Sequence, residues 1–190
     1  MCRRRLLAIA LITLGCGSEG AGCRSGPTLM PSPPPGVTMA TLTVTSQSFP
    51  VNGPIPIDHS CDGADRSPQL TWSAPPAGTK SFAIVVDDPD AQGSSAFTHW
   101  IAYNIGGDLL ALPEGADVAK LGGAAGTNDF KRPGWGGPCP PKMEIHHYQF
   151  RVYALDTTLT IADEVTRTTI DGALSGHVLA EGTLVGTFSH

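Results

Sequence analysis

Short runs of β-forming residues alternate with segments rich in glycine and proline, and this alternation is the feature that most restricts the fold. The runs with the composition or the alternation of strands cover residues 41–49, 81–87, 97–105, 147–155 and 182–188. The 190 residues include 23 glycines and 17 prolines, which end strands and form turns. A chain of this length has room for one sizeable core, so a single, mainly β domain is expected.

A helical pattern is visible only at residues 168–179, and Gly172 and Gly176 weaken it because glycine is a poor helix former. The sequence therefore predicts an all-β fold, a two-sheet antiparallel β-sandwich with one or two short helices in the C-terminal region.

The first 15 residues are typical of an export signal, because three arginines precede an apolar run too short to span a membrane as a mature helix. Leu14, Gly15 and Cys16 resemble the lipobox of bacterial lipoproteins. We expect cleavage after residue 15 and lipidation of Cys16, with Cys23 or a plain secretory signal as the alternatives. The protein would be an exported, membrane-anchored lipoprotein of the periplasm or outer membrane, or be secreted.

Residues 16–39 hold five prolines and few large apolar side chains, so they are expected to form a disordered tether before a domain at residues 40–190. Removal of residues 1–15 takes away three of the 12 basic residues and no acid, which moves the formal charge from −5 to −8. This charge argues against nucleic acid as a partner, and it leaves the N-terminal lipid as the only expected membrane contact.

Three carboxylates follow the apolar run at residues 81–87. Asp87, Asp88 and Asp90 surround Pro89, which sets a turn at the end of the expected strand. Like charges held this close call for a cationic or hydrogen-bonding partner. The cluster is either a solvated acidic turn or part of a site.

Histidines lie in or beside two of the strand-like runs. His99 is either a satisfied structural residue or a site residue. Alternation sends His146 and His147 to opposite faces, so that one of them can face a site. We expect Tyr148 to point in the same direction as His147, unless the strand is bent at His146.

Motifs for metal binding and catalysis are absent from the sequence. It has no His-x-x-x-His, Cys-x-x-Cys or EF-hand-like loop, no Gly-x-Ser-x-Gly, and no Ser or Cys in an activated context. We therefore expect no catalytic residue, no metal and no cofactor. A metal site built from Asp88, His99 and His146 remains an alternative.

Several short motifs occur in an order and spacing that are highly specific together. They are SCDG (60–63), SPQLTW (67–72), PPAGTKS (75–81), DDPDA (87–91), THW (98–100) with NI (104–105), GTNDF (126–130), GWGGPCPP (134–141), HHY (146–148) with YALD (153–156), and GHVLA (176–180). From about residue 42 onward the chain resembles the phosphatidylethanolamine-binding protein family, in particular its bacterial Raf-kinase-inhibitor-like (YbhB/YbcL) branch.

This resemblance implies Greek-key sheets and a small surface pocket for phosphate-like or carboxylate-like anions. The residues that match the family's ligand-binding pocket are Asp88 with Asp90 as its support, His99, His146, Tyr148, and Gly137 and Pro138 at the rim. The family often has Arg where this chain has His147, which reduces the positive charge near the rim at neutral pH. We expect weak anion binding that becomes tighter below about pH 6.5, where free histidine is protonated.

Residues 126–141 are expected to form a long loop that leads to His146. Asn128 and Asp129 are expected to accept backbone N–H groups, Trp135 to pack over the turn, and Gly136 to Pro138 to bring main chain near an anion. The resemblance also places Cys61 and Cys139 near the pocket, which implies a disulfide between them.

The sequence thus predicts a non-catalytic exported binding protein whose partner is an anionic small molecule, a phospholipid head group or a phosphorylated protein that it modulates. Two alternatives remain. The first is a hydrolase that uses His99, His146 and Asp88 as general acid and base, and the second is a protease-inhibitor or interaction module.

Overall fold

The computed structural model describes residues 39–162 and 164–190. The expected signal peptide (1–15), the expected lipidation site Cys16 with its alternative Cys23, and all of the expected tether except Met39 lie outside the described residues. Within the described part of the chain, no helix has the length and apolar character needed to cross a membrane.

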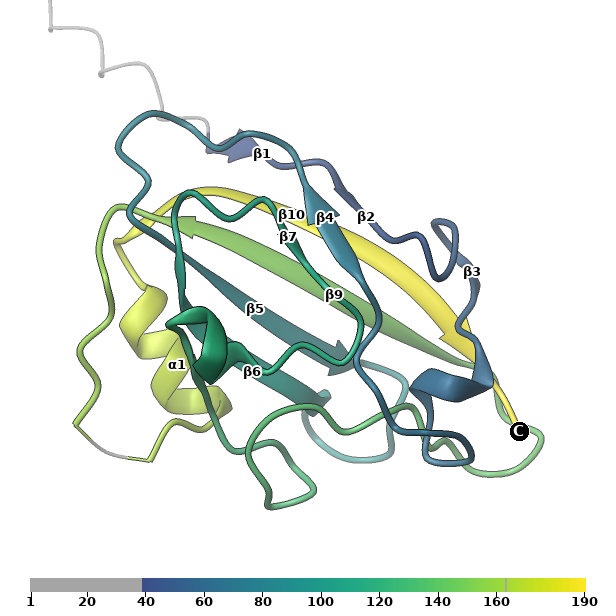
Figure 1. Ribbon diagram of the computed structural model, residues 1–190. Coiled ribbons are helices and arrows are strands. Elements are labelled where there is room, and N and C mark those ends of the chain that lie inside the picture. The colour runs from purple at the N-terminus through teal and green to yellow at the C-terminus, as the bar shows by residue number, and fades with distance from the viewer. Residues whose placement is uncertain (1–38, 163) are drawn as a thin grey trace, which may run out of the picture. The chain divides into compact units, whose positions relative to one another are not determined.

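Two β-sheets make up most of the described fold (Figure 1). The larger, seven-stranded sheet contains β1 (Ala40–Thr41), β3 (Gly53–Pro54), β5 (Ser81–Asp88), β6 (Phe97–Gly106), β8 (Ala124–Ala125), β9 (His146–Leu155) and β10 (Val178–Phe188). The smaller, three-stranded sheet contains β2 (Val44–Thr45), β4 (Leu70–Trp72) and β7 (Ala111–Leu112). The predicted two-sheet β fold is confirmed.

Antiparallel pairing dominates both sheets. The larger sheet runs β1-β10-β9-β5-β6-β8. The chain leaves β6, passes through β7 in the other sheet, and returns first as β8 beside β6 and then as β9 beside β5. Two short strands differ from the expectation, because β1 and β3 pair with β10 in parallel. Each contributes two residues at the margin of the sheet, and the four long strands β10, β9, β5 and β6 are antiparallel to one another.

One α-helix, α1 (Arg167–Leu174), forms in the C-terminal region, and two 3-10 turns, Ile57–His59 and Val118–Leu121, occur earlier. A capping box between Thr166 and Thr169 starts α1. The helix ends before residue 179, where the pattern had placed its end, because Gly176 takes a left-handed conformation with φ of +82° and starts the turn into β10.

Strand β5 is buried on both faces, which explains its continuous apolar sequence. Phe82, Ile84 and Val86 belong to the core cluster that includes Leu70 and Trp72 of the smaller sheet. Ala83 and Val85 instead belong to a second cluster with Ile170 and Leu174 of α1. Figure 1 shows α1 beside the larger sheet. Alternation along β5 therefore carries the two following carboxylates, Asp87 and Asp88, to opposite faces.

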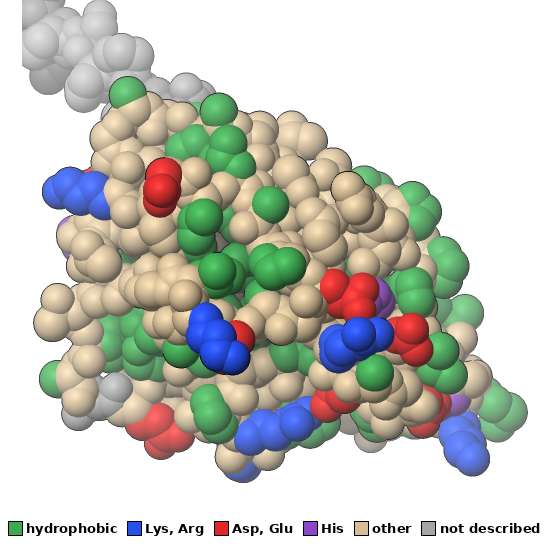
Figure 2. All heavy atoms as spheres, viewed as in Figure 1, with side chains coloured by type: hydrophobic (Ala, Val, Ile, Leu, Met, Phe, Trp, Pro, Cys, Tyr) green, Lys and Arg blue, Asp and Glu red, His purple; other side chains and the backbone are tan. Residues whose placement is uncertain are grey.

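Charged side chains of both signs lie next to one another on the face drawn in Figure 2. The ion pairs of the described residues include Arg66 with Glu114, at 3.0 Å, and Arg132 with Asp65, at 2.6 Å. Such exposed pairs contribute little to stability, but they balance charge locally.

Candidate functional site at the ends of three strands

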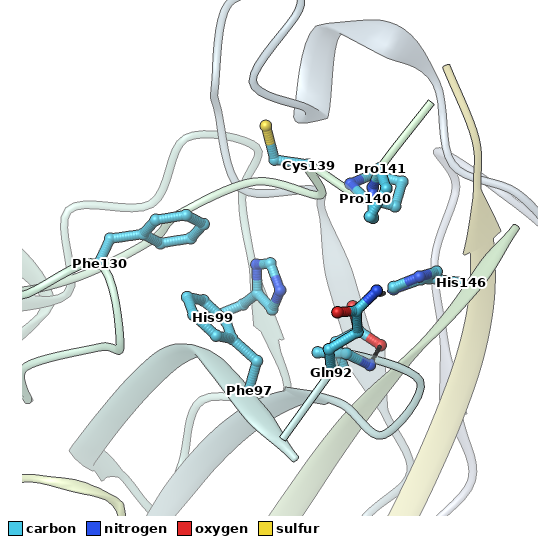
Figure 3. Close-up of a pocket in the computed structure, with 10 residues that line it drawn as sticks. Gln92, Phe97, His99, Phe130, Cys139, Pro140, Pro141 and His146 are labelled. Carbon is cyan, nitrogen blue, oxygen red and sulfur yellow. Dashed lines mark hydrogen bonds and ion pairs between the residues drawn. The ribbon is translucent and has the colours of Figure 1, made fainter. Parts of the chain in front are cut away.

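A pocket of about 330 Å³ lies where β5 ends and where β6 and β9 begin (Figure 3). Its lining residues are Asp88, Ala91, Gln92, Phe97, His99, Phe130, Cys139, Pro140, Pro141 and His146. Three of the residues expected from the sequence, Asp88, His99 and His146, therefore share one cavity, although they are separated along the chain. Each is buried, with 3 to 4% of its surface exposed.

The Asp88 carboxylate is fully engaged by its surroundings. Its Oδ1 accepts hydrogen bonds from the backbone N–H groups of Asp90, at 2.9 Å, and Ala91, at 3.1 Å. Its Oδ2 lies 2.7 Å from Nδ1 of His146. The turn that follows Pro89 thus supplies the hydrogen bonds that make a buried carboxylate acceptable.

His146 is held between two carboxylates. Nδ1 donates to Asp88 Oδ2, and Nε2 lies 3.1 Å from Oε2 of Glu144. Burial lowers the pKa of His146, but the hydrogen bonds to Asp88 and Glu144 and the charges of Asp88 and Asp90 outweigh it, so the pKa is raised above 6.5. Because a carboxylate only accepts, the ring that serves both is an imidazolium.

His99 has the opposite character. Its Nδ1 lies 2.7 Å from the carbonyl oxygen of Gly136, and because a carbonyl only accepts, Nδ1 carries the proton. Burial lowers the pKa of His99 below 6.5, despite that hydrogen bond and the charge of Asp88. The neutral ring therefore keeps an unprotonated Nε2, which accepts hydrogen bonds. Phe97 and Phe130 pack against the imidazole, with ring centroids 5.1 and 5.4 Å away.

Tyr148 shares a face of β9 with His146 and not with His147. His146 and Tyr148 are both buried, whereas His147 between them is exposed, as strand alternation requires. The expectation that Tyr148 points with His147 is therefore wrong. The Tyr148 ring packs edge-on against His99 at 5.1 Å, and its hydroxyl is buried without a hydrogen bond among the described residues. Burial and the nearby Asp88 charge raise its pKa.

Asp90 lies outside the pocket lining and is exposed. Its carboxylate accepts from the backbone N–H of His147, at 2.8 Å, and lies 2.7 Å from Nδ1 of the same residue. The side-chain hydrogen bond from His147 lowers the Asp90 pKa. Asp90 therefore supports Asp88 through its backbone N–H, while its side chain ties β9 to the turn after β5.

The pocket rim differs from the expected one. Gly137 and Pro138 are buried but do not line the cavity, and Cys139, Pro140 and Pro141 do. The Gly137 N–H donates to Asp65 Oδ1 at 2.7 Å, so this main chain is already bonded to protein. A Cβ on Gly137 would lie 2.3 Å from the His59 carbonyl oxygen, so close packing is what requires glycine here.

The remaining parts of the long loop act as braces. The Asp129 carboxylate accepts from the Thr98 N–H at 2.8 Å, and Asn128 Oδ1 accepts from the Arg132 N–H at 3.3 Å. Trp135 packs against Trp100 and Phe150, with centroids 5.7 and 6.0 Å away. These contacts hold the loop against β6 and β9, which positions the Gly136 carbonyl for His99.

Cys61 and Cys139 are joined by a disulfide in the structure, with their Cα atoms 5.5 Å apart. Next to it, the Cys61 N–H donates to the Pro138 carbonyl oxygen at 3.0 Å. The disulfide therefore links the loop after the first 3-10 turn directly to the pocket rim.

Sequence reasoning missed Glu144 and the apolar walls. Glu144 precedes His146 by two residues, and the alternation that pairs His146 with Tyr148 could have flagged it as a neighbour on the same side. Phe130, Pro140 and Pro141 lay inside quoted motifs, but no pattern in one sequence distinguishes a wall residue from a turn residue.

The metal site considered at Asp88, His99 and His146 finds no support in the geometry. Among residues 39–162 and 164–190, the one group of three metal-ligand side chains that meets within 4.8 Å is Cys61, Cys139 and His190. Both nitrogens of His146 already face carboxylates.

Comparisons with known proteins agree with this architecture. The family model described as phosphatidylethanolamine-binding protein matches residues 45–189. The chain is 39% identical to the UPF0098 protein PH1269 of Pyrococcus horikoshii over 97% of its own length and 89% of that protein. It is 36% identical to a Mycobacterium tuberculosis protein named "Putative lipoprotein LppC", over 96% of this chain and 92% of that one.

The crystal structure of YbcL from Escherichia coli, described as a new member of the mammalian PEBP family, superposes with a TM-score of 0.74 at 36% identity. The match covers 80% of this chain and 99% of YbcL. The family model spans most of the described residues, and the relatives align over most of their own length. The chain belongs to the phosphatidylethanolamine-binding protein family.

Proposed function

We propose that the pocket binds a phosphate-like group without catalytic turnover. The observation that carries this proposal is the environment of His146, a buried imidazolium at the pocket that already holds a carboxylate on Nε2. The Glu144 side chain that supplies this carboxylate is 46% exposed, so it can turn into solvent. A ligand oxygen would then take its place on His146.

His99 favours phosphate over the carboxylate-like ligands that the sequence also allowed. Its neutral ring offers an acceptor at Nε2, and a singly or doubly protonated phosphate has a P–OH group that can donate to it. Sulfate and carboxylate carry no proton near neutral pH and have only acceptors to offer. The two histidines thus select a group that can accept a hydrogen bond from His146 and donate one to His99.

The remaining expected site residues have supporting roles in this proposal. Asp88 orients His146 and keeps it protonated, as acidic partners commonly do for imidazoles. The buried Tyr148 hydroxyl has no hydrogen bond of its own among the described residues, so a ligand oxygen that reaches it would satisfy a donor. Asp90 and Gly137 act through their backbone N–H groups, which donate to Asp88 and Asp65. Pro138 acts through its carbonyl oxygen, which accepts a hydrogen bond from the Cys61 N–H.

The dependence on pH follows from the two opposite pKa shifts. His146 keeps its charge until the pH exceeds its raised pKa, so phosphate binding should persist above pH 6.5 and weaken at higher pH. His99 becomes a cation only as the pH falls through its lowered pKa. Selection of phosphate over sulfate should therefore be strongest near neutral pH and fade in acid, where His99 becomes a donor.

Isothermal titration calorimetry with inorganic phosphate and with sulfate at pH 7 tests the proposal. We expect phosphate binding, no comparable sulfate binding, and phosphate affinity roughly fivefold higher in Glu144→Gln, because the internal competitor loses its charge. The matched control is Glu181→Gln. Glu181 is exposed and lies on β10 opposite Tyr153, away from the end of β9 that lines the pocket. Absence of phosphate binding from pH 5 to pH 7 would refute the proposal.

The hydrolase alternative has a specific weakness. The pocket lining contains no serine or threonine among the described residues, and its one cysteine, Cys139, is in a disulfide. The Asp88–His146 pair thus has no side-chain nucleophile to activate. Both ring nitrogens of His146 also face carboxylates, so the ring is not placed to take a proton from water. Phosphoester and peptide substrates assayed with wild type and His146→Ala would reveal activity if it exists.

A phospholipid head group is the source of phosphate that the surface favours. Its phosphodiester carries no P–OH group, so the ammonium of an ethanolamine head group would be the donor to Nε2 of His99. Met143 is 94% exposed and Ile145 is 66% exposed, and both lie between pocket residues Pro141 and His146 in the chain. Exposed apolar side chains beside a head-group site can enter the acyl boundary, which would add a membrane contact to the N-terminal lipid expected from the sequence. In a Cys16→Ser background, which removes the proposed lipid, a Met143→Ser, Ile145→Ser variant should lose binding to vesicles that contain phosphatidylethanolamine while keeping its affinity for free phosphate. Equal vesicle binding would point to a phosphorylated protein partner instead.

We also propose that the protein is exported and carries lipid on Cys16. The similarity to a protein with a lipoprotein name supports this proposal, as does the sequence before Cys16. Mass spectrometry of the membrane fraction should find the lipid on wild type and on Cys23→Ser but not on Cys16→Ser. Lipid that is lost only in Cys23→Ser would move the site to Cys23.

A further inference from the structure

Two cysteines and a histidine from distant parts of the chain meet beside the pocket. Ligand atoms of Cys61, Cys139 and His190 all lie within 4.8 Å of one another, and all three residues are exposed. The cysteines are 78 positions apart and are joined as a disulfide in this structure. None of the pocket contacts of His99 or His146 involves this cluster.

A fourth residue orients the histidine. Asp62 Oδ2 lies 2.5 Å from Nδ1 of His190, which leaves Nε2 available to a ligand. Metal-bound histidines are commonly held in this way, with the distal nitrogen donating to a carboxylate. The Phe188 ring packs edge-on against the imidazole at 5.9 Å, so His190 is positioned from two sides.

The two cysteines are also held together by contacts that do not depend on the disulfide. The Cys61 N–H donates to the Pro138 carbonyl, and Asp65 accepts from the N–H of Gly137. Asp65 is in turn paired with Arg132 at 2.6 Å. Reduction therefore leaves the two thiols on adjoining segments of backbone that remain bonded to each other.

We propose that the reduced protein binds a zinc ion through the Cys61 and Cys139 thiolates and Nε2 of His190, with water in the fourth position. Two thiolates and one imidazole match the ligand preference and the tetrahedral geometry of Zn²⁺, and they are too soft for Mg²⁺ or Ca²⁺. Disulfide and zinc exclude each other, so the site is open only to reduced protein.

The chemistry balances with a dithiol as the reductant. The dithiol gives two electrons and two protons to the Cys61–Cys139 disulfide and becomes a disulfide itself, which leaves two thiols on the protein. Zinc then binds as those thiols release two protons. Because this site does not use the pocket histidines, its existence is independent of the phosphate-binding proposal.

Cobalt is a suitable probe, because Co²⁺ occupies zinc sites and absorbs light when thiolates bind it. We expect the full chain, reduced with a phosphine, to develop a thiolate-to-cobalt band that saturates at one Co²⁺ per chain and disappears when Zn²⁺ is added. The oxidised chain should show no band. The chain has three other cysteines, Cys2, Cys16 and Cys23, so Cys61→Ser, Cys139→Ser is titrated in parallel and should also show none.

His190→Ala leaves the disulfide pair intact and should weaken cobalt binding roughly tenfold or more. The control is His177→Ala, because His177 is also exposed and bound to a carboxylate, Asp156, at 2.8 Å, yet lies outside the cluster. The proposal is overturned if reduced wild type shows no thiolate band, if the double cysteine variant keeps the band, or if His190→Ala binds cobalt as tightly as His177→Ala.

Discussion

Asp87 and Asp88 are neighbours in sequence and equally buried, yet they lie in two different kinds of environment. Asp87, on the helix side of β5, is 2% exposed and faces two arginines, and Asp88, on the pocket side, is 3% exposed and faces His146. Arginine keeps its charge at every physiological pH, whereas histidine does not. Two consecutive carboxylates thus have different roles: Asp87 belongs to a permanent structural ion pair, and Asp88 belongs to a site that titrates.

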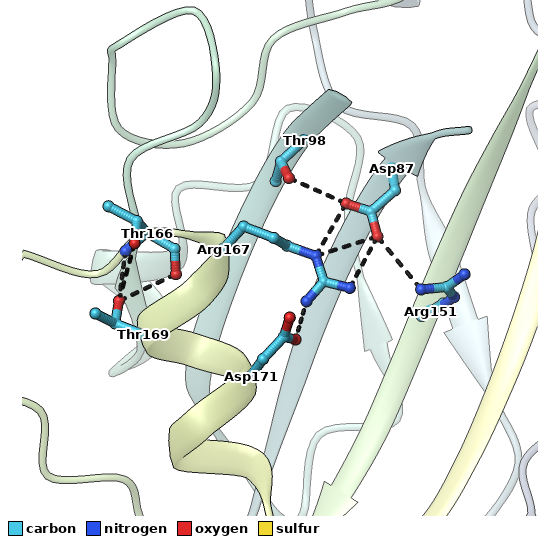
Figure 4. Close-up of polar contacts among 7 residues, drawn as sticks. All are labelled: Asp87, Thr98, Arg151, Thr166, Arg167, Thr169 and Asp171. Carbon is cyan, nitrogen blue, oxygen red and sulfur yellow. Dashed lines mark hydrogen bonds and ion pairs between the residues drawn. The ribbon is translucent and has the colours of Figure 1, made fainter. Parts of the chain in front are cut away.

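Figure 4 shows the Asp87 side of this comparison. Nε of Arg167 lies 3.2 and 3.3 Å from the two carboxylate oxygens of Asp87, Arg151 Nη1 lies 3.4 Å away, and the Thr98 hydroxyl donates at 3.2 Å. Arg167 is the first residue of α1, and its outer end pairs with Asp171 on the same helix. Asp87 therefore anchors the start of α1 to the centre of the sheet.

The largest effect should come from Asp87→Asn. Removal of the charge leaves Arg167 and Arg151, which are 28 and 33% exposed, without their shared partner. Breaking a buried pair in this way costs about 3 kcal/mol of unfolding free energy. Urea denaturation at pH 7 measures it, with Asp171→Asn, the exposed partner of Arg167, as a control that should lose less than about 0.5 kcal/mol. Similar losses in both variants would show that Asp87 is not the anchor.

Asp88→Asn should separate binding from stability. The amide oxygen can still accept from the Asp90 and Ala91 N–H groups, but the amide NH2 would oppose the Nδ1–H of His146. We expect about 1 kcal/mol of lost stability and roughly tenfold weaker phosphate binding by calorimetry, because His146 loses the partner that keeps it charged. Asp87→Asn that still folds should keep wild-type affinity. A larger binding loss in Asp87→Asn would reverse the comparison.

Changing the pH should affect the two histidines in opposite directions. The raised pKa of His146 stabilises the fold fully below pH 6.5, and this contribution is lost as the pH rises through the folded-state value. The lowered pKa of His99 stabilises the fold above pH 6.5, and this contribution is lost as the pH falls. Each unit of difference is worth about 1.4 kcal/mol.

NMR titration of the two imidazoles measures this directly, with His146→Gln and His99→Gln to assign the signals. The His146 midpoint should lie above 6.5 and the His99 midpoint below it. The reverse order would contradict a charged His146 beside a neutral His99.

The smallest effect should come from the exposed end of the same site. His147 and Asp90 pair at 2.7 Å, but their side chains are 53 and 41% exposed, so His147→Ala should cost less than about 0.5 kcal/mol. Urea denaturation at pH 6 would check this. A loss that equals that of Asp88→Asn would mean that the exposed pair, and not the buried one, holds β9 to the turn.

The features that could be predicted from the sequence were those tied to periodicity or to motif order. The apolar run at residues 81–87 predicted the strand β5, and the alternation of β9 placed His146 and His147 on opposite faces. The ordered motifs pointed to Asp88, His99 and His146, which share the pocket. The end of α1 was missed because Gly176 stops the helix in a left-handed turn, which a helical pattern does not reveal.

The features that could not be predicted depend on which atoms meet. The hydrogen bond from Nδ1 of His99 to the Gly136 carbonyl leaves Nε2 of His99 as an acceptor, and the Glu144 carboxylate occupies Nε2 of His146. Neither contact has a periodic signature. Gly137 and Pro138 were placed at the rim by motif, but Asp65, more than 70 residues earlier in the chain, captures the Gly137 N–H and shifts the rim to Cys139.

The most direct test of the central claim is a crystal structure of the protein soaked in inorganic phosphate at pH 7. We predict a phosphate in the pocket, with one oxygen on Nε2 of His146, a P–OH group on Nε2 of His99 and the Glu144 carboxylate turned into solvent. A phosphate bound elsewhere, or a pocket that stays empty at saturating phosphate while Glu144 remains on His146, would contradict the account.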